Sequence, residues 1–132
     1  MTYSLDTNII AALLRGDDKV TKRWRYERTQ GNQSIISIIV YYETKRGLVA
    51  SGATTKLQAF NRLFSVLGVE PLTIADVEAA SLIYAERKKQ GKPMEDTDLL
   101  IAAQAVARKH TLVTNNTKHF DNIQDLIIKD WI

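Results

Sequence analysis

Short apolar runs alternate with longer amphipathic stretches along the chain, and glycines stand at several of the boundaries. Runs such as Tyr3–Leu5 and Leu112–Thr114 suit buried strands, whereas apolar residues at every third or fourth position suit helices. Strands that alternate with helices predict parallel β-α-β units, because a parallel connection has to cross over the sheet. The pattern therefore predicts an α/β fold in three layers, with a central, mostly parallel sheet flanked by helices.

The expected elements follow one another with short connections and leave no linker or repeat. Strands are expected over Tyr3–Leu5, Ser34–Ser37, Val69–Leu72, Leu112–Thr114 and Leu126–Ile128. Helices are expected over Thr7–Arg15, Asp17–Gln30, Val40–Ser51, Ala53–Leu67, Ile74–Gln90 and Asp96–Lys109. Because glycine is common just past a helix end, we expect Gly68 to terminate the fourth helix.

The bulk composition excludes several classes of protein. With 132 residues, 45% hydrophobic and 25% charged, the chain suits one globular domain over residues 1–132. It has no cysteine, which fits a reducing compartment. Asp6 interrupts the first apolar stretch and no run approaches the roughly 18 residues of a membrane helix, so we expect no membrane partner and a cytoplasmic location. The net charge of +3 leans mildly toward polyanionic partners.

Three carboxylates lie where a ligand site is expected. In an open α/β sheet, ligands bind beyond the carboxyl ends of the strands. Asp6 directly follows the first expected strand, Glu43 lies in the helix after the second, and Asp98 lies in the first turn of a later helix. We expect these three side chains to converge at one edge of the sheet.

Each acid also has a purely structural interpretation. Asp6 or Thr7 could cap the first helix. Asp98 could be a first-turn acid that the helix dipole favours. Glu43 is harder to explain in this way, because it follows the apolar segment 38–42, where a solvated charge is out of place.

A cluster of three carboxylates requires compensation. Two such charges about 5 Å apart at an effective dielectric constant near ~20 repel by about 3 kcal/mol. The cluster persists by taking up protons or by holding a cation. Oxygen ligands without cysteine or a well-placed histidine select Mg²⁺ or Mn²⁺ rather than Zn²⁺.

Four motifs carry a resemblance to a known family. They are Leu5-Asp6-Thr7-Asn8, Ser34–Ser37 with Glu43 downstream, Asp96–Ala103, and Leu112–Asn116 followed by Phe120. In this order and spacing the chain resembles PIN domains from Tyr3 to Trp131. The short length, the Thr-Asn-Asn-Thr stretch and the Asp130-Trp131 ending are most similar to VapC-type toxins.

The resemblance implies an activity and partners. VapC-type toxins are Mg²⁺- or Mn²⁺-dependent endoribonucleases, usually homodimeric, and a cognate VapB-like antitoxin encoded beside them inhibits them. Asp6, Glu43 and Asp98 match the family's acidic, metal-binding and catalytic positions. The resemblance also implies that an activated water hydrolyses the RNA phosphodiester, leaving a 5′-phosphate and a 3′-hydroxyl.

Further polar residues are expected around the acids. Thr7, Asn8 and Thr114 match polar positions of the family. The family often has a fourth acid where this chain has Asn116, which adds no charge to hold a second cation, so we expect one well-occupied metal. Asp96 is the alternative fourth acid, two residues before Asp98.

Basic residues near the acidic edge suit a polyanionic substrate. We expect Arg15, Lys45 and Arg46 to contact the RNA backbone, since a carboxylate pocket alone would repel it. The basic group that starts at Arg87 and continues to Lys92 is instead interpreted as a solvated helix face.

The remaining notable side chains are interpreted as structural. His110 and His119 flank a strand and are expected to be loop residues rather than catalysts, because neither lies near a carboxylate in sequence. Trp24 and Trp131 are expected to pack. An apolar stripe is expected in the core or at a dimer interface, and it consists of Leu57, Phe60, Leu63, Phe64 and Leu67.

Three other functions share some of these sequence features. A non-catalytic PIN-like module that binds nucleic acid or protein would be expected to lack Asp6 or Glu43, yet both are present. A phosphoacceptor receiver domain wants paired acids after the first strand, whereas Asp6 stands alone. A structure-specific DNA nuclease remains an alternative, because it would use the same chemistry.

Overall fold

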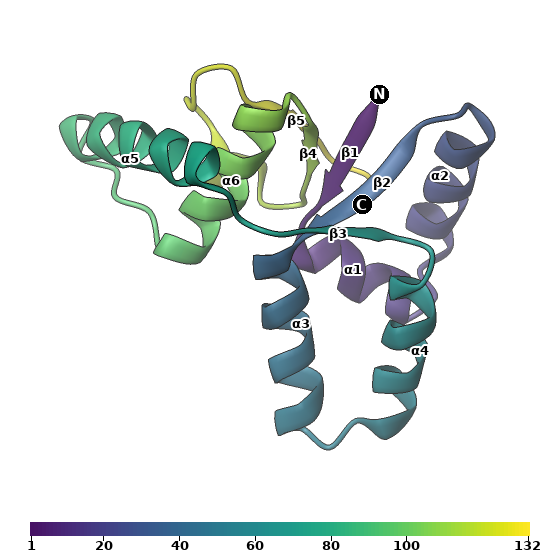
Figure 1. Ribbon diagram of the computed structural model, residues 1–132. Helices are drawn as coiled ribbons and strands as arrows, with labels where there is room; N and C mark the ends of the chain where they lie inside the picture. Colours follow the sequence, from purple (N-terminus) through teal and green to yellow (C-terminus); the bar gives the residue numbers. More distant parts are fainter.

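A five-stranded parallel sheet forms the centre of the molecule, in a computed structural model that describes all 132 residues (Figure 1). The strand order is β3-β2-β1-β4-β5, so β1 has β2 on one side and β4 on the other. Ser4 of β1 pairs with Ile35 of β2 and with Leu112 of β4. The strands are β1 (Thr2–Leu5), β2 (Gln33–Ser37), β3 (Gly68–Glu70), β4 (Thr111–Val113) and β5 (Ile127–Lys129).

Six α-helices flank the sheet, which confirms the predicted α/β architecture. The helices α5 and α6 pack together on one side, whereas α1 and α2 lie on the other, and α3 and α4 extend as a helical hairpin (Figure 1). No helix is both long enough and apolar enough to span a bilayer. The helices are α1 (Thr7–Leu14), α2 (Asp18–Thr29), α3 (Ile38–Ala50), α4 (Thr54–Phe64), α5 (Ile74–Lys89) and α6 (Asp96–Arg108), with a short 3₁₀ helix η1 (Thr117–Phe120) before β5.

One continuous core of 22 buried residues holds the layers together. The central strands contribute Leu5, Leu112 and Val113, which are fully inaccessible to solvent. Helix α6 faces them with Ile101 and the buried Ala102–Ala103 pair. Small side chains let α6 approach its neighbours closely, because packed interiors leave few voids larger than a water molecule. The first turn of α6 is thereby fixed close to the ends of the central strands.

The main departure from the predicted elements concerns Gly68. It does not end α4, which stops at Phe64, but begins strand β3. Gly68 pairs with Ile35, and a Cβ atom at this position would lie 3.3 Å from Ile35 Cγ2. The absence of a side chain at Gly68 therefore allows β3 to lie close to β2, which is a second role of glycine inside sheets.

Other boundaries shift by one or two residues. Helix α3 begins at Ile38 rather than Val40, because Ser37 caps it by accepting a hydrogen bond from the Ile39 backbone N–H at 3.1 Å. Strands β4 and β5 are each displaced by one residue from the predicted ranges.

The aromatic residues pack as the sequence suggests. Trp131 is buried and lies edge-on to Tyr3, with ring centroids 5.2 Å apart. Trp24 is half-buried, and the Arg28 guanidinium covers its ring. In the apolar stripe of α4, Phe60 is fully buried and packs on Tyr41 of α3.

The expectation for the basic group on α5 is wrong at one residue. Arg87 is buried rather than solvated, and its guanidinium donates hydrogen bonds to the backbone carbonyls of Lys92, His119 and Asp121. The chain turns after α5 and again after η1, and the carbonyl groups of both turns point toward the Arg87 guanidinium. Only the tertiary structure brings them there, so the local sequence around Arg87 carries no sign of this role.

Candidate active site

A polar site lies beyond the carboxyl ends of β1 and β4, where neighbouring connections leave the sheet in opposite directions. Such a switch point is where open α/β sheets bind ligands. The chain after β1 runs into α1 and the chain after β4 runs into η1. Asp6 follows β1 and donates its backbone N–H to the Val113 carbonyl of β4 at 2.9 Å. The two strand ends are therefore joined directly at the site.

Asp6 is both a helix cap and the buried acid of the site. Its Oδ1 accepts the Thr7 backbone N–H at 2.8 Å, which caps α1. Its Oδ2 accepts the Thr114 hydroxyl at 2.8 Å and the Asn8 side-chain amide at 3.3 Å. Only 4% of Asp6 is exposed. Capping accounts for one oxygen of the carboxylate, whereas the other is held by Asn8 in the first turn of α1 and by Thr114 just after β4.

Asn8 and Thr114 form a rigid support for that second oxygen. Asn8 Nδ2 also donates to Thr114 Oγ1 at 3.2 Å, and Asn8 Oδ1 accepts the Asn115 backbone N–H at 2.9 Å. Thr114 is fully buried. These bonds join α1 to the segment after β4, although the residues are more than a hundred positions apart in the chain. They fix the orientation of the Asp6 carboxylate.

Glu43 reaches the site from the second turn of α3. Its Oε1 accepts the Thr7 hydroxyl at 3.2 Å, and its Oε2 lies 3.9 Å from Arg46 Nη2. The Glu43 side chain is 19% exposed and the Arg46 side chain 55% exposed. Thr7 thus connects the Asp6 cap with Glu43. Arg46, through this weak ion pair at the surface, is the only positively charged residue that contacts the acids from the α3 side.

Asp98 enters from the first turn of α6 and meets a histidine. His119 Nε2 lies 2.8 Å from Asp98 Oδ2. The expectation of a loop residue is corrected here, because His119 lies in the short helix η1 and contacts an acid that is distant in sequence. The two residues are 21 positions apart, and the turn from β4 into η1 brings them together. His110, by contrast, contacts Glu70 away from the site, with Nε2 3.0 Å from Oε1.

Burial and like charge act together on two of the acids. Burial raises the pKa of the Asp6 carboxyl, and the charge of Asp98 raises it further, against the hydrogen bonds from its neighbours. Burial likewise raises the pKa of Glu43, with added contributions from Asp98 and Asp6. The charge of Arg46 lowers the pKa of Glu43 but does not reverse its shift, so positive charge from the protein compensates the cluster only in part.

The two candidates for a fourth ligand differ in position. The Asn116 backbone N–H donates to Thr114 Oγ1 at 3.1 Å, which places the residue next to the Asp6 support, and its side chain makes no hydrogen bond. Asp96 is exposed and makes neither a hydrogen bond nor an ion pair. Asn116 is therefore the better positioned of the two for a contact at the site.

The basic residues proposed for RNA contact occupy different places. Arg46 pairs with Glu43, and Arg15 lines a shallow cavity of about 250 Å³ together with Thr7. Lys45 instead contacts Tyr41, with Nζ 3.1 Å from the phenol oxygen. Lys45 is thus turned toward the α3–α4 hairpin, and Arg46 is the basic residue that contacts the acids.

The donor set fits a hard divalent cation. No three side chains of Asp, Glu, His or Cys are close enough together to share one ion directly. Mg²⁺ needs fewer, because it keeps several waters and binds proteins through one or two carboxylates together with substrate phosphates. Asp6 and Asp98 can supply those carboxylates, with Glu43 acting through water. The incompletely compensated negative charge at Asp6 and Glu43 favours a cation of this kind.

Comparison with known proteins identifies the family. The PIN domain model matches residues 3–126. The chain belongs to the PIN-domain family. Ribonuclease VapC1 of Haemophilus influenzae strain R2866 is 32% identical over 135 aligned positions, which cover 99% of this chain and 98% of that protein. This likeness over the full length places the chain with the VapC members of the family.

Further relatives extend the likeness. The tRNA(fMet)-specific endonuclease VapC of Shigella flexneri is 28% identical, with 99% of this chain and 98% of that protein covered. The crystal structure of VapBC2 from Rickettsia felis, bound to a DNA fragment from its promoter, matches with a TM-score of 0.89 and 29% identity. That match covers 100% of both chains.

Proposed function

We propose that this PIN-domain chain is a Mg²⁺- or Mn²⁺-dependent endoribonuclease, the toxin of a type II toxin–antitoxin pair. The observation that carries the proposal is the buried carboxylate of Asp6, held by Thr114 and Asn8 and raised in pKa beside Asp98. A site built to keep an acid in this position is suited to hold a cation. The VapC relatives named as ribonucleases supply the substrate class.

Each side chain has a role in the proposed reaction. Asp6 and Asp98 would hold the cation, and Glu43, held by Thr7, would orient water toward the scissile phosphate. When bound, a divalent cation supplies neutralisation of phosphate charge and activation of water. Thr114 and Asn8 keep Asp6 in one orientation, since groups behind a ligand tune its geometry. Arg46 and Arg15 would contact the RNA backbone, with a smaller contribution from Lys45, which is turned toward Tyr41.

The proposed partners follow from the relatives. The Rickettsia felis structure is a VapBC complex, which supports an antitoxin of the VapB type for this chain. We propose that a basic side chain of such an antitoxin enters among Asp6, Glu43 and Asp98, and that the toxin forms a homodimer. Expression of the chain alone should arrest growth, and co-expression of the neighbouring gene should relieve the arrest.

The decisive experiment is cleavage of purified RNA with and without metal. Wild-type protein should cleave transfer RNA or single-stranded RNA in Mn²⁺ or Mg²⁺ and lose the activity in excess chelator. Asp6→Asn should lower the rate about 10²–10³-fold, because metal-bound charge stabilisation is worth several kcal/mol. Asparagine caps helices about as well as aspartate, so the variant should fold.

Two outcomes would contradict the proposal. Undiminished cleavage in chelator, or by Asp6→Asn, would exclude the metal mechanism. Cleavage of duplex DNA with no cleavage of RNA would instead identify the chain as a DNA nuclease that uses the same residues.

A further inference from the structure

Asp98 has a single hydrogen-bond partner, and that partner is His119. Asp6 is held by three donors and Glu43 by the Thr7 hydroxyl, but the carboxylate of Asp98 accepts only from His119, at 2.8 Å. An ionised Asp98 carboxylate, the form that binds a cation, can only accept, so His119 Nε2 is the donor in that form. Without this bond the Asp98 side chain, which is 26% exposed, would be free to turn about its own rotatable bonds.

The position of Asp98 in its helix does not explain its orientation. Asp98 is the third residue of α6, where an acid can form a capping box by accepting the N-cap backbone N–H. The N-cap residue, Glu95, has no such bond with Asp98 and no side-chain cap of its own. The Asp98 carboxylate is directed away from the helix end and toward His119. The contact is therefore a tertiary one.

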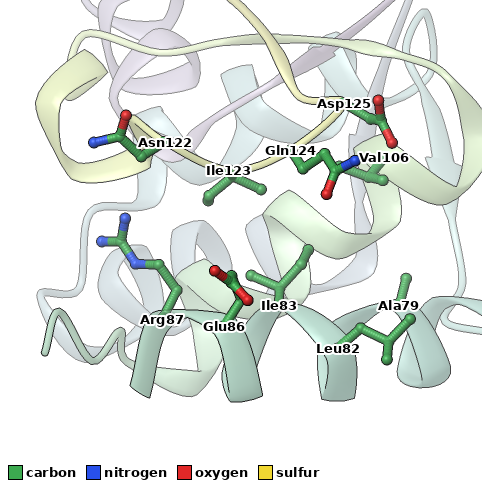
Figure 2. Close-up of a pocket in the computed structure, with 10 residues that line it drawn as sticks. All are labelled: Ala79, Leu82, Ile83, Glu86, Arg87, Val106, Asn122, Ile123, Gln124 and Asp125. Carbon is green, nitrogen blue, oxygen red and sulfur yellow. The ribbon is translucent and has the colours of Figure 1, made fainter. Parts of the chain in front are cut away.

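Arg87 fixes the turn that carries His119. Its Nη2 donates to the His119 carbonyl at 3.3 Å and its Nη1 to the Asp121 carbonyl at 2.8 Å. Figure 2 shows Arg87 extending from α5 toward the segment that carries Asn122, at one end of a cavity of about 390 Å³. The His119 ring also lies edge-on to the buried ring of Phe120. The C-terminal end of η1 is thus anchored.

The same guanidinium fixes the segment that leads to Asp98. Arg87 Nε donates to the Lys92 carbonyl at 2.9 Å, in the connection between α5 and α6. A planar guanidinium with several donors suits a junction of three carbonyls, and a lysine ammonium lacks this fork geometry. One buried side chain therefore ties together the two segments that carry His119 and Asp98.

We propose that His119 is a positioning residue for the cation site: its Nε2–H holds the Asp98 carboxylate in the orientation that binds the metal, and Arg87 holds the turn from which His119 reaches it. The inference rests on the proposed function, since it assumes that Asp98 binds a cation. Hydrogen-bond partners behind carboxylate ligands commonly change metal affinity about 10–100-fold when removed.

The test is the affinity for Mn²⁺ alone, measured by calorimetry without RNA. His119→Ala should weaken Mn²⁺ binding about 10–100-fold. His119→Gln should restore most of the loss, because its amide nitrogen can reach the same carboxylate oxygen. His119 is exposed, so both variants should melt like wild type in chelator. Arg87→Lys should weaken Mn²⁺ binding as well and should also lower the melting temperature.

A matched control comes from the second histidine. His110 also contacts a carboxylate, that of Glu70, but outside the site, so His110→Ala should leave Mn²⁺ affinity unchanged. Unchanged affinity in His119→Ala would overturn the inference. Failure of His119→Gln to restore binding would mean that the imidazole itself ligates the metal, which also overturns a positioning role. If wild type binds no Mn²⁺, the proposed function falls together with the inference.

Discussion

Two aspartates hold the same position in two neighbouring helices and have opposite surroundings. Asp76 is the third residue of α5 and Asp98 the third residue of α6. Asp76 is 1% exposed and completes a capping box, accepting the Thr73 backbone N–H at 2.8 Å. Asp98 caps nothing and contacts His119 instead. The same residue at the same helical position thus serves stability in one helix and the candidate site in the other.

Compensating charge distinguishes Asp76 from Asp6, the buried acid of the site. Arg108 donates to both oxygens of Asp76 and also pairs with Glu70 at 3.0 Å. Burial alone would raise the pKa of Asp76, but the hydrogen bonds from Arg108 and Thr73 outweigh it and lower the pKa. At the site, burial raises the pKa of Asp6 and no arginine reverses the shift. A buried acid whose charge is compensated by protein side chains indicates a structural role. A buried acid whose charge is not compensated indicates a site for a ligand.

The largest expected effect is a loss of activity without a loss of stability when Asp98 is replaced. Asp98→Asn should lower the rate of RNA cleavage about 10²–10³-fold, as loss of a metal ligand removes several kcal/mol of transition-state stabilisation. Its free energy of unfolding, measured by urea denaturation in chelator, should change by only about 0.5 kcal/mol, because the residue caps no helix and is partly exposed. A cleavage rate close to that of wild type would remove Asp98 from the site.

The reverse result is expected at Asp76. Asp76→Asn leaves Arg108 without its buried partner and should lower the free energy of unfolding by about 3 kcal/mol. Activity of the folded fraction should not change. Glu78→Gln is the control, because Glu78 lies on the same helix, is exposed and makes no polar contact. Equal free energies of unfolding for the Asp76 and Glu78 variants would contradict the structural role of Asp76.

The dependence of the unfolding free energy on pH should identify Asp76 as the stabilising group. The pKa of Asp76 is lower in the folded chain than in the unfolded one, so the folded state binds fewer protons. Its stabilisation is therefore complete above the ordinary carboxylate pKa of about 4 and is lost as the pH falls through the lowered folded value. The difference in unfolding free energy between wild type and Asp76→Asn should stay constant near neutral pH and shrink at acid pH. A difference that grows on acidification would contradict the sign of the shift.

The smallest effect concerns the basic residues beside the acids. Arg46→Ala should weaken RNA binding and reduce the slope of log affinity against log salt by about 1, as expected for one phosphate contact. Lys45→Ala should have less effect, because Lys45 is turned toward Tyr41. Both are to be measured in the Asp6→Asn background, which prevents cleavage during titration. Equal slopes for the two variants would show that neighbouring charge matters more than contact with the acidic cluster.

Periodicity and motif order in the sequence predict the layers of this protein and the residues at its strand ends. Periodicity reflects which face of each element is buried, so the alternation of strands and helices predicted the parallel sheet and located Asp6 at the end of β1. The order of the four motifs predicted the family, which the match over residues 3–126 confirms. Element boundaries were less exact, because caps such as Ser37 and close strand contacts such as that of Gly68 depend on neighbours.

Which polar side chains meet depends on the tertiary fold. His119 and Asp98 are 21 residues apart, and no local pattern marks their contact. Arg87 resembles the exposed basic residues around it, yet it is buried against three carbonyls of two separate turns. Asp76 and Asp98 cannot be told apart by helical position, because their difference lies in whether Arg108 or His119 reaches them. Hydrogen bonds and charges act over a few ångströms in space, and the fold sets those distances between residues that are far apart along the chain.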